Sequence, residues 1–236
     1  MKKNILWLVP LSFLALSACT DKIAGSKAKD VKLENDVDRF SYALGQQYGR
    51  NLKSMELDYN KDIVVASMLS SAAGEESKLS DQEINEAFSK ARKTVMEKQE
   101  KEAEKNLETG KIFLEKNKSA EGVKVTESGL QYQIVKEGTG KSPAADDVVK
   151  VHYKGTLIDG TEFDSSYKRN QPAEFPVGGV IAGWTEALKM MKVGATWKLF
   201  IPSELAYGAS GRPSIPGNSV LIFDVELLEI KDKAKK

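Results

Sequence analysis

Thiols and imidazoles are almost absent from this sequence, which contains one cysteine, Cys19, and one histidine, His152. A single cysteine excludes an internal disulfide, so the fold must be stable through packing alone. The same scarcity leaves no cluster of ligands for a zinc site. A serine–histidine–aspartate triad would have to use His152, but its place beside Tyr153 on a predicted strand favours a structural role. The sequence therefore predicts no metal and no cofactor.

An excess of one charge is also lacking, because 35 Lys and Arg residues are balanced by 34 Asp and Glu residues. A chain without a basic excess is not expected to bind nucleic acid. Of its 236 residues, 41% are hydrophobic and 29% are charged. These values are typical of a soluble protein of one or two domains that is large enough to bury a core.

Long hydrophobic runs are missing except near the start, where the apolar residues 5–16 are too few to span a bilayer. They follow two lysines, as the apolar part of a signal peptide does. Residues 16–19 (LSAC) resemble a bacterial lipobox, which predicts a signal peptide at residues 1–18 and a lipid on Cys19. Thr20 resembles the pattern of lipoproteins that are sorted to the outer membrane and face the periplasm. The alternative is an ordinary secretory signal and a soluble periplasmic protein.

The next segment is predicted to be an all-helical domain. Residues 19–34 are polar and without an apolar period, which predicts a flexible tether. Apolar residues then recur at steps of three and four over residues 35–53, which predicts a helix. A second helix is predicted over residues 60–73, with Asn60 as its cap. These two helices form the predicted domain at residues 35–79.

A third and much longer helix begins with a capping box of Ser80 and Glu83. No proline follows in the chain until Pro143, so one helix is predicted from residue 81 to about residue 117, roughly 55 Å long. It forms a predicted connecting segment at residues 80–118. Its middle is charged on every face, as in a helix that crosses solvent between two bodies. Near its end the helix is expected to pack against a folded domain again, despite Gly110, through Leu107, Ile112, Phe113 and Leu114.

Residues 119–236 predict an antiparallel sheet with one short helix, which is an α+β domain. Residues 149–153 alternate as a half-buried strand does, and Asp159-Gly160 is a typical hairpin turn. Further strands are predicted at residues 196–201 and 220–230, and the helix at residues 185–191. The predicted fold is a C-terminal antiparallel sheet wrapped on a short helix, joined by a long helix to the helical N-terminal domain.

Five short blocks of the C-terminal domain carry a resemblance to a known family, and they occur in that family's order. They are residues 151–155 (VHYKG), 160–166 (GTEFDSS), 180–184 (VIAGW), 205–208 (LAYG) and 221–227 (LIFDVEL). The domain resembles FKBP-type peptidyl-prolyl cis-trans isomerases, which rotate the peptide bond before proline. Residues 40–45 (FSYALG) are similar to the N-terminal domain of the Mip-like (macrophage infectivity potentiator) and FkpA-like lipoprotein group, whose members are homodimers.

The resemblance implies a proline-binding pocket with Trp184 as its floor. Tyr153, Asp164 and Tyr207 are the implied catalytic residues. The Tyr207 hydroxyl is expected to donate to a substrate carbonyl, and Asp164 to orient Tyr153 or polarise the bond. The Ile215 backbone N–H is a further candidate donor. The implied substrate-binding residues are Phe163, Phe175, Val180, Ile181, Trp184, Ile215 and Phe223.

Simpler roles stay open for three of these residues. Phe163 and Phe223 lie on predicted strands, whose residues usually face a core. Asp164 is also suited to an Asx turn with the two serines that follow it.

The chain departs from the family's usual pattern at three positions. Ala173 stands where many members have a larger residue, which predicts a thinner pocket wall. Gly217 replaces a common proline, and Arg212 occupies a variable loop position. These departures bear on substrate preference and on inhibitor affinity.

Two functions are predicted. The first is an isomerase that speeds the folding of proline-containing, partly folded exported proteins in the bacterial envelope and binds the family's macrolide inhibitors. The alternative is a dimeric, ATP-independent holding chaperone that uses the isomerase domain as a docking site. Exposed apolar positions on the N-terminal helices need a partner surface and agree with a homodimer: Phe40, Leu44, Tyr48, Ile63, Val64, Met68, Phe88 and Val95.

Overall fold

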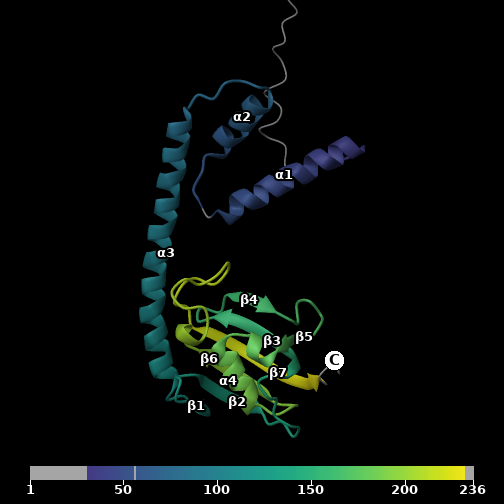
Figure 1. Ribbon diagram of the computed structural model, residues 1–236, viewed down its shortest axis with the longest axis vertical. Helices are drawn as coiled ribbons and strands as arrows, with labels where there is room; N and C mark the ends of the chain where they lie inside the picture. Colours follow the sequence, from purple (N-terminus) through teal and green to yellow (C-terminus); the bar gives the residue numbers. More distant parts are fainter. Residues whose placement is uncertain (1–30, 56, 232–236) are drawn as a thin grey trace, which may run out of the picture. The chain divides into compact units, whose positions relative to one another are not determined.

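The computed structural model describes residues 31–55 and 57–231 (Figure 1). It divides the chain into two compact units, with the boundary between Ala91 and Arg92. The predicted signal peptide, the lipidation site Cys19 and most of the predicted tether lie outside the described residues. None of the described helices is both long and apolar enough to cross a membrane.

The N-terminal unit contains α1 (Asp36–Ser54), α2 (Lys61–Ala72) and the start of α3. The Asn35 side chain caps α1 by accepting a hydrogen bond of 3.0 Å from the Asp38 N–H. Asn60 caps α2 in the same way, accepting from the Ile63 N–H at 3.2 Å. Both predicted helices are confirmed to within a residue or two, because each has a side chain that satisfies otherwise unpaired N–H groups.

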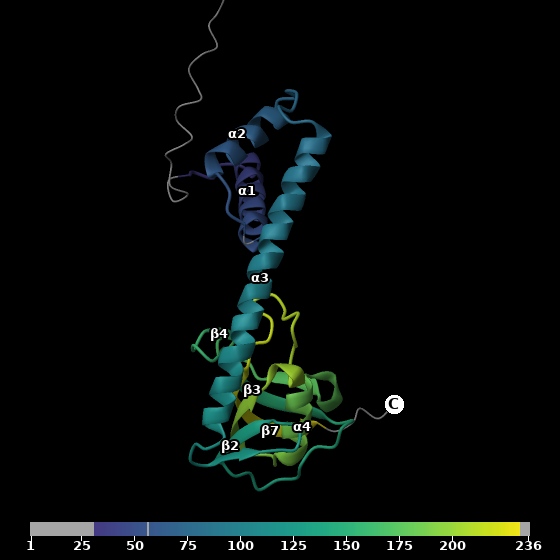
Figure 2. The same ribbon diagram turned by 90° about the vertical axis from the view of Figure 1, so that its left-hand side faces the viewer.

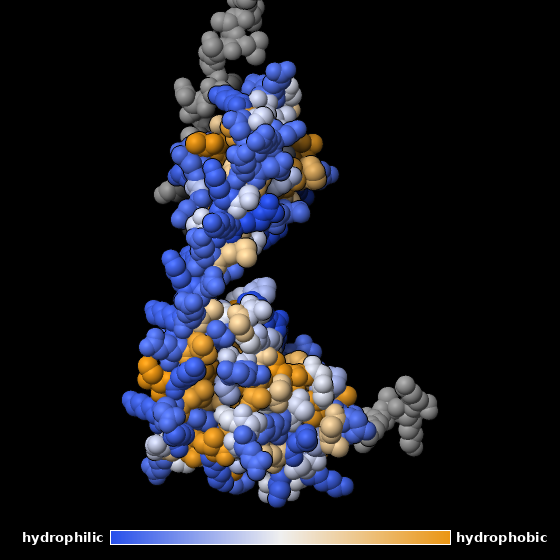
Figure 3. All heavy atoms as spheres, turned by 60° about the vertical axis from the view of Figure 1, so that its left-hand side comes forward, coloured by the Kyte–Doolittle hydropathy of each residue, from blue (hydrophilic) through white to orange (hydrophobic). Residues whose placement is uncertain are grey.

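The first two helices do not build a core within one chain. No residue of α1 or α2 in the described chain is buried. Val37 is 72% exposed and Phe40 is 68% exposed, and both lie on α1. Figure 3 shows apolar side chains at the surface of this unit. The predicted excess of unburied apolar residues is therefore present.

Helix α3 (Asp81–Asn117) has the predicted bounds. The Ser80 N–H donates to the Glu83 carboxylate at 2.8 Å, and the Glu83 N–H donates to Ser80 Oγ at 3.3 Å. This capping box fixes the start of the helix. Residues 96–102 are all exposed, in agreement with their charged sequence.

The second half of α3 belongs to the C-terminal unit and runs beside its sheet, as Figure 2 shows. The Gln131 side chain donates to the Leu114 carbonyl at 2.9 Å, and the rings of Phe113 and Phe200 lie 6.0 Å apart. Gly110 is the buried residue of this helix. Ile112 was expected to make contact but is 63% exposed, because it lies on the solvent side of the helix.

The C-terminal unit is one antiparallel sheet in the order β1-β2-β6-β7-β3-β4, with β5 paired to β3. Its long central strands β3 and β7 pair along their whole length. Short 3-10 turns cover residues 177–179 and 203–205. The strands are β1 (Val123–Val125), β2 (Gln131–Lys136), β3 (Val148–Leu157), β4 (Glu162–Ser165), β5 (Ala173–Pro176), β6 (Thr196–Ile201) and β7 (Leu221–Lys231).

One short helix, α4 (Ala182–Met190), packs on this sheet (Figure 1). Ala187 and Leu188 are buried against it. A Cβ on Gly183 would lie only 2.5 Å from Ile201 Cγ2, so the glycine allows the helix to approach β6 closely. The helix begins three residues before the predicted start, because no side chain caps it and Ile181 gives no sequence signal for a cap.

Replacement of Gly110 by alanine distinguishes a packing role from a flexible point in α3. At an exposed helical position this change stabilises a protein by about 1 kcal/mol. Here the new Cβ would lie 2.8 Å from Val220 Cγ2, so we expect a loss of about 1–2 kcal/mol. Urea unfolding of the form lacking residues 1–19 is followed by tryptophan fluorescence, since Trp184 and Trp197 both lie in the C-terminal unit. The exposed control Lys111→Ala is expected to change stability by less than about 0.5 kcal/mol. Stabilisation by Gly110→Ala would contradict the packing role.

Candidate active site

The strands place two aromatic side chains, Phe163 and Phe223, over one glycine, Gly155. Along β3 the buried residues alternate, which turns Val149, Val151 and Tyr153 toward the core. A Cβ on Gly155 would lie 2.6 Å from the Phe163 ring and 2.7 Å from the Phe223 ring. The missing side chain therefore leaves room for both rings, which meet edge to face with centroids 5.5 Å apart.

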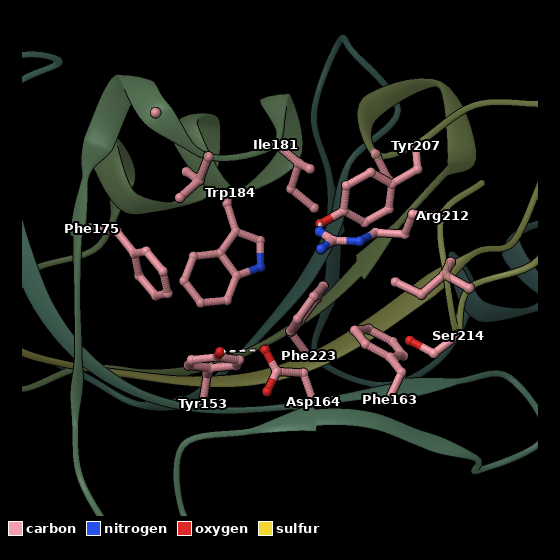
Figure 4. A pocket seen from close by; sticks show the side chains of 14 residues that line it. Tyr153, Phe163, Asp164, Phe175, Ile181, Trp184, Tyr207, Arg212, Ser214 and Phe223 are labelled. Carbon is pink, nitrogen blue, oxygen red and sulfur yellow. Dashed lines mark hydrogen bonds between the residues drawn. The ribbon is translucent and has the colours of Figure 1, made fainter. Parts of the chain in front are cut away.

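Trp184, from the first turn of α4, lies at the centre of the aromatic cluster (Figure 4). Its ring makes edge-to-face contacts with Tyr153 at 5.3 Å, Phe223 at 5.2 Å and Phe175 at 5.8 Å between centroids. It is only 4% exposed. Such contacts fix the indole as a rigid apolar surface.

These rings border a pocket of about 730 Å³. The structure brings every residue that the resemblance assigned to the pocket into its lining, although what each does to a substrate stays a prediction. Four further lining residues were not predicted as such: Gly179, Ala206, Arg212 and Ser214. Phe223 is buried at 5% exposure and also lines the pocket, so its core role and its pocket role coincide.

A polar cluster lies at one side of the pocket. The Tyr153 hydroxyl donates to Asp164 Oδ2 at 2.5 Å. Arg169 donates to the other oxygen of the same carboxylate and, at 2.8 Å, to the Tyr153 hydroxyl. The Asp164 carboxylate thus holds Tyr153 and Arg169. Arg169 was not singled out from the sequence, and its only signal is a cation five residues after Asp164.

The cluster sets the charge states of its members. Burial acts to raise the pKa of Asp164, but the hydrogen bonds from Tyr153 and Arg169 and the charge of Arg169 outweigh it, so the pKa lies below its ordinary value. Burial, followed by the hydrogen bond to Asp164, raises the pKa of Tyr153. At neutral pH Asp164 is therefore ionised and Tyr153 is neutral. Neither group is poised to exchange a proton with a substrate.

His152 lies outside the pocket lining. Its Nδ1 is 2.9 Å from Ser166 Oγ, and its ring stacks on Tyr167 with centroids 4.6 Å apart. These contacts support the structural role that its sequence position predicts.

Tyr207 stands on the loop between β6 and β7 and is half-buried. Its hydroxyl accepts a hydrogen bond of 2.9 Å from Arg212 Nη1. Because the arginine uses the oxygen as an acceptor, the hydroxyl proton is left to donate to another group. Figure 4 shows both side chains at the same end of the pocket.

The Ile215 N–H is not the free donor that the sequence suggested. It donates to the Arg212 carbonyl at 2.9 Å, while the Arg212 N–H donates to the Ile215 carbonyl at 2.9 Å. This two-residue turn contains Ser214 at φ 71°, which the sequence does not indicate. The Ile181 N–H, also in the lining, makes no hydrogen bond to any residue that the structure describes. It replaces Ile215 as the available backbone donor.

Two of the departures from the family pattern can be placed in the structure. Ala173 pairs with Val151 between β5 and β3 and is half-buried on the same face of β5 as the lining residue Phe175, but it is not itself among the lining residues, so the thinner wall stays a prediction. Gly217 also lies outside the lining. A Cβ there would lie 2.1 Å from the Ala209 carbonyl oxygen and 3.0 Å from the Ala103 Cβ, so glycine lets the loop approach α3.

Within residues 31–55 and 57–231, no group of three or more His, Cys, Asp and Glu side chains is arranged to hold a metal ion.

Comparisons with known proteins agree with this geometry. The profile of the family described as FKBP-type peptidyl-prolyl cis-trans isomerase matches residues 139–228. The profile of the domain amino terminal to FKBP-type peptidyl-prolyl isomerase matches residues 37–134. The chain is 44% identical to the FKBP-type peptidyl-prolyl cis-trans isomerase FkpA of Escherichia coli K12, over 96% of this chain and 86% of the relative.

Two further comparisons cover most of the chain. Identity to the outer membrane protein MIP of Legionella longbeachae is 40%, over 96% of this chain and 98% of the relative. The crystal structure of FkpA from Escherichia coli is matched with a TM-score of 0.61 at 44% identity, over 85% of this chain and 99% of that structure. The chain therefore belongs to the FKBP-type peptidyl-prolyl cis-trans isomerases and is an enzyme of that class.

Proposed function

We propose that the pocket binds the proline ring of an X-Pro segment on Trp184 and accelerates rotation about the preceding peptide bond. The observation that carries this proposal is the Trp184 ring, which is held by three other aromatic rings and borders the pocket. A rigid apolar surface suits a pyrrolidine ring.

The chemistry needs no nucleophile. The barrier to rotation, ~18–20 kcal/mol, is the amide resonance that is lost when the bond twists. The planar amide is more polar than the twisted one, so removal of water from the bond disfavours the planar state. The aromatic lining supplies a site with little water around the bond.

The polar residues act by positioning. The Tyr207 hydroxyl donates to the carbonyl of the residue before proline, while Trp184 holds the ring on the other side of the rotating bond. Asp164 keeps Tyr153 against Trp184 through its hydrogen bond. The Ile181 N–H is available for a second substrate carbonyl. The two sides of the bond are then held by different parts of the pocket, which favours a rotated geometry.

The proposed substrates are proline-containing, partly folded proteins exported to the bacterial envelope. The lipobox-like residues 16–19 and the name of the Legionella relative, an outer membrane protein, support an envelope location. The family's macrolide inhibitors are proposed to bind in the same pocket.

Removal of the Tyr207 hydroxyl tests its proposed role. Loss of one neutral hydrogen bond lowers kcat/KM by roughly two- to tenfold, so the loss of kcat/KM in Tyr207→Phe is expected to lie in this range. Asp164→Ala is expected to lose at least as much, because it removes the acceptor of the Tyr153 hydroxyl and the carboxylate that pairs with Arg169. The measurement is a protease-coupled assay of cis-to-trans isomerisation on a short proline peptide.

Matched controls come from outside the pocket. Tyr132 stacks on Trp197, and Asp224 pairs with Lys198, so Tyr132→Phe and Asp224→Ala are expected to keep full activity. A folded wild-type protein without catalysis, or equal losses in variants and controls, would contradict the proposed role of the pocket.

A second proposal concerns the N-terminal helices, predicted as a dimerisation domain at residues 35–79. Their exposed apolar residues favour a homodimer in which α1 and α2 of one chain pack on a second copy. Such a dimer would also suit the alternative function, a holding chaperone. Suppression of aggregation that survives Tyr207→Phe would support a chaperone role independent of isomerisation.

Sedimentation tests the dimer. We expect the form lacking residues 1–19 to sediment as a dimer at micromolar concentration. Phe40→Glu is expected to make it monomeric, because a charge would be buried in the interface. The control Ile112→Glu places the same charge at an exposed position of α3 and is expected to leave a dimer. A monomeric wild-type protein would exclude the proposal, while the isomerase assay should be unaffected by Phe40→Glu.

A third proposal is that a lipid on Cys19 anchors the protein to the membrane. The support is the lipobox-like sequence, in which the chain's one cysteine falls at the modified position. Labelled palmitate is expected to be incorporated into the wild-type protein and not into Cys19→Ser, which should be released from the membrane fraction. Membrane association of Cys19→Ser equal to that of the wild type would argue against lipid anchoring.

A further inference from the structure

One charged side chain in the pocket has no role in the proposed reaction. Arg212 lines the pocket beside Tyr207. Its guanidinium carbon lies 4.9 Å from the centroid of the Tyr207 ring, and its Nη1 donates to the Tyr207 hydroxyl at 2.9 Å. Figure 4 shows the guanidinium pointing into the pocket, toward the side chains around Trp184. The remaining N–H donors of the guanidinium are not used by this contact.

The charge of Arg212 is not balanced within the pocket. The lining contains two charged residues, Asp164 and Arg212. Asp164 is already paired with Arg169. No carboxylate lies within 4.0 Å of the Arg212 guanidinium in the part of the chain that the structure describes. The pocket therefore has an unpaired cation at the end where Tyr207 stands.

Hydrogen bonds hold the backbone of the loop that carries Arg212. Arg212 and Ile215 exchange two backbone hydrogen bonds of 2.9 Å, and the Asn218 N–H donates to the Gly208 carbonyl at 2.8 Å. Behind the loop, the Asn218 side chain donates to the Ala103 carbonyl of α3, and Asn106 of α3 donates to the Gly217 carbonyl, both at 3.2 Å. A charge on a fixed loop loses little conformational freedom when a ligand binds.

We propose that Arg212 is a specificity-determining residue that favours substrates with Asp or Glu immediately before the proline. The inference rests on the proposed function of the pocket. If the Tyr207 hydroxyl binds the carbonyl of the residue before proline, the guanidinium lies 2.9 Å from that hydroxyl and within reach of the same residue's side chain. A carboxylate there forms a charge-assisted hydrogen bond, which is stronger than a neutral one.

The test compares peptides that differ by one charge. Isomerisation of Ala-Glu-Pro-Phe and of the neutral Ala-Gln-Pro-Phe is measured by NMR exchange, which needs no protease with preferences of its own. We expect kcat/KM to be roughly two- to tenfold higher for the Glu peptide at low salt, and the ratio to fall as salt is added. For Ala-Gln-Pro-Glu, which has the acid after proline, the gain in kcat/KM over the neutral peptide is expected to be smaller.

Variants of Arg212 separate charge from positioning. In Arg212→Met the Glu/Gln ratio is expected to fall to about one, in Arg212→Lys to stay above one, and in Arg212→Glu to invert. A general effect on Tyr207 would change both peptides alike and cancel in the ratio. Lys192→Met, which removes an exposed cation outside the pocket, should leave the ratio unchanged.

The outcomes distinguish the inference from the function on which it rests. Catalysis of the Gln peptide with the same Glu/Gln ratio in wild type and Arg212→Met would overturn the role of Arg212 alone. A larger gain for the acid after proline than before it would overturn the assigned position. Absence of catalysis on every peptide would overturn the proposed function of the pocket itself.

Discussion

The C-terminal unit depends on the packing of one short helix against a much larger sheet. Helix α4 has nine residues, whereas β3 and β7 have ten and eleven. A helix of this length cannot cover the whole inner face of the sheet. Trp184, from its first turn, closes part of the remaining area by packing against rings from β3, β5 and β7. The pocket is the part of the face that stays open, so the core and the candidate active site share the same side chains.

Because the core and the pocket share side chains, the shape of the pocket depends on small residues as much as on aromatic ones. The rings of Phe163 and Phe223 occupy space over Gly155 that any side chain would fill, and α4 approaches β6 through Gly183. The loop that carries Tyr207 and Arg212 meets α3 at Gly217, where a Cβ would overlap a backbone oxygen. The aromatic pocket is thus shaped by close approaches that only glycine permits.

The fold and the identity of the pocket residues could largely be predicted from the sequence, but their contacts could not. Capping side chains and alternating strands are local signals, so α3 and β7 were found with bounds correct to within a residue, whereas the predicted strand at residues 149–153 covers only the first part of β3. The pairing of Arg169 with Asp164 depends on the path of the chain between them, and the closed turn that occupies the Ile215 N–H depends on the positive φ of Ser214; neither has a clear signal in the sequence. The start of α4 was missed because Ile181 is not a capping residue.

The two units differ in how much of their apolar surface is buried within one chain. In the C-terminal unit the apolar residues of six strands, β2 to β7, and of α4 cover one another within a single chain. In α1 and α2 the side-chain caps are complete, but each cap contributes only about 1 kcal/mol. Isolated helices of 19 and 12 residues are marginal in water. Because no residue of either helix is buried, capping alone cannot account for their stability, and the missing burial must come from a surface outside these two helices.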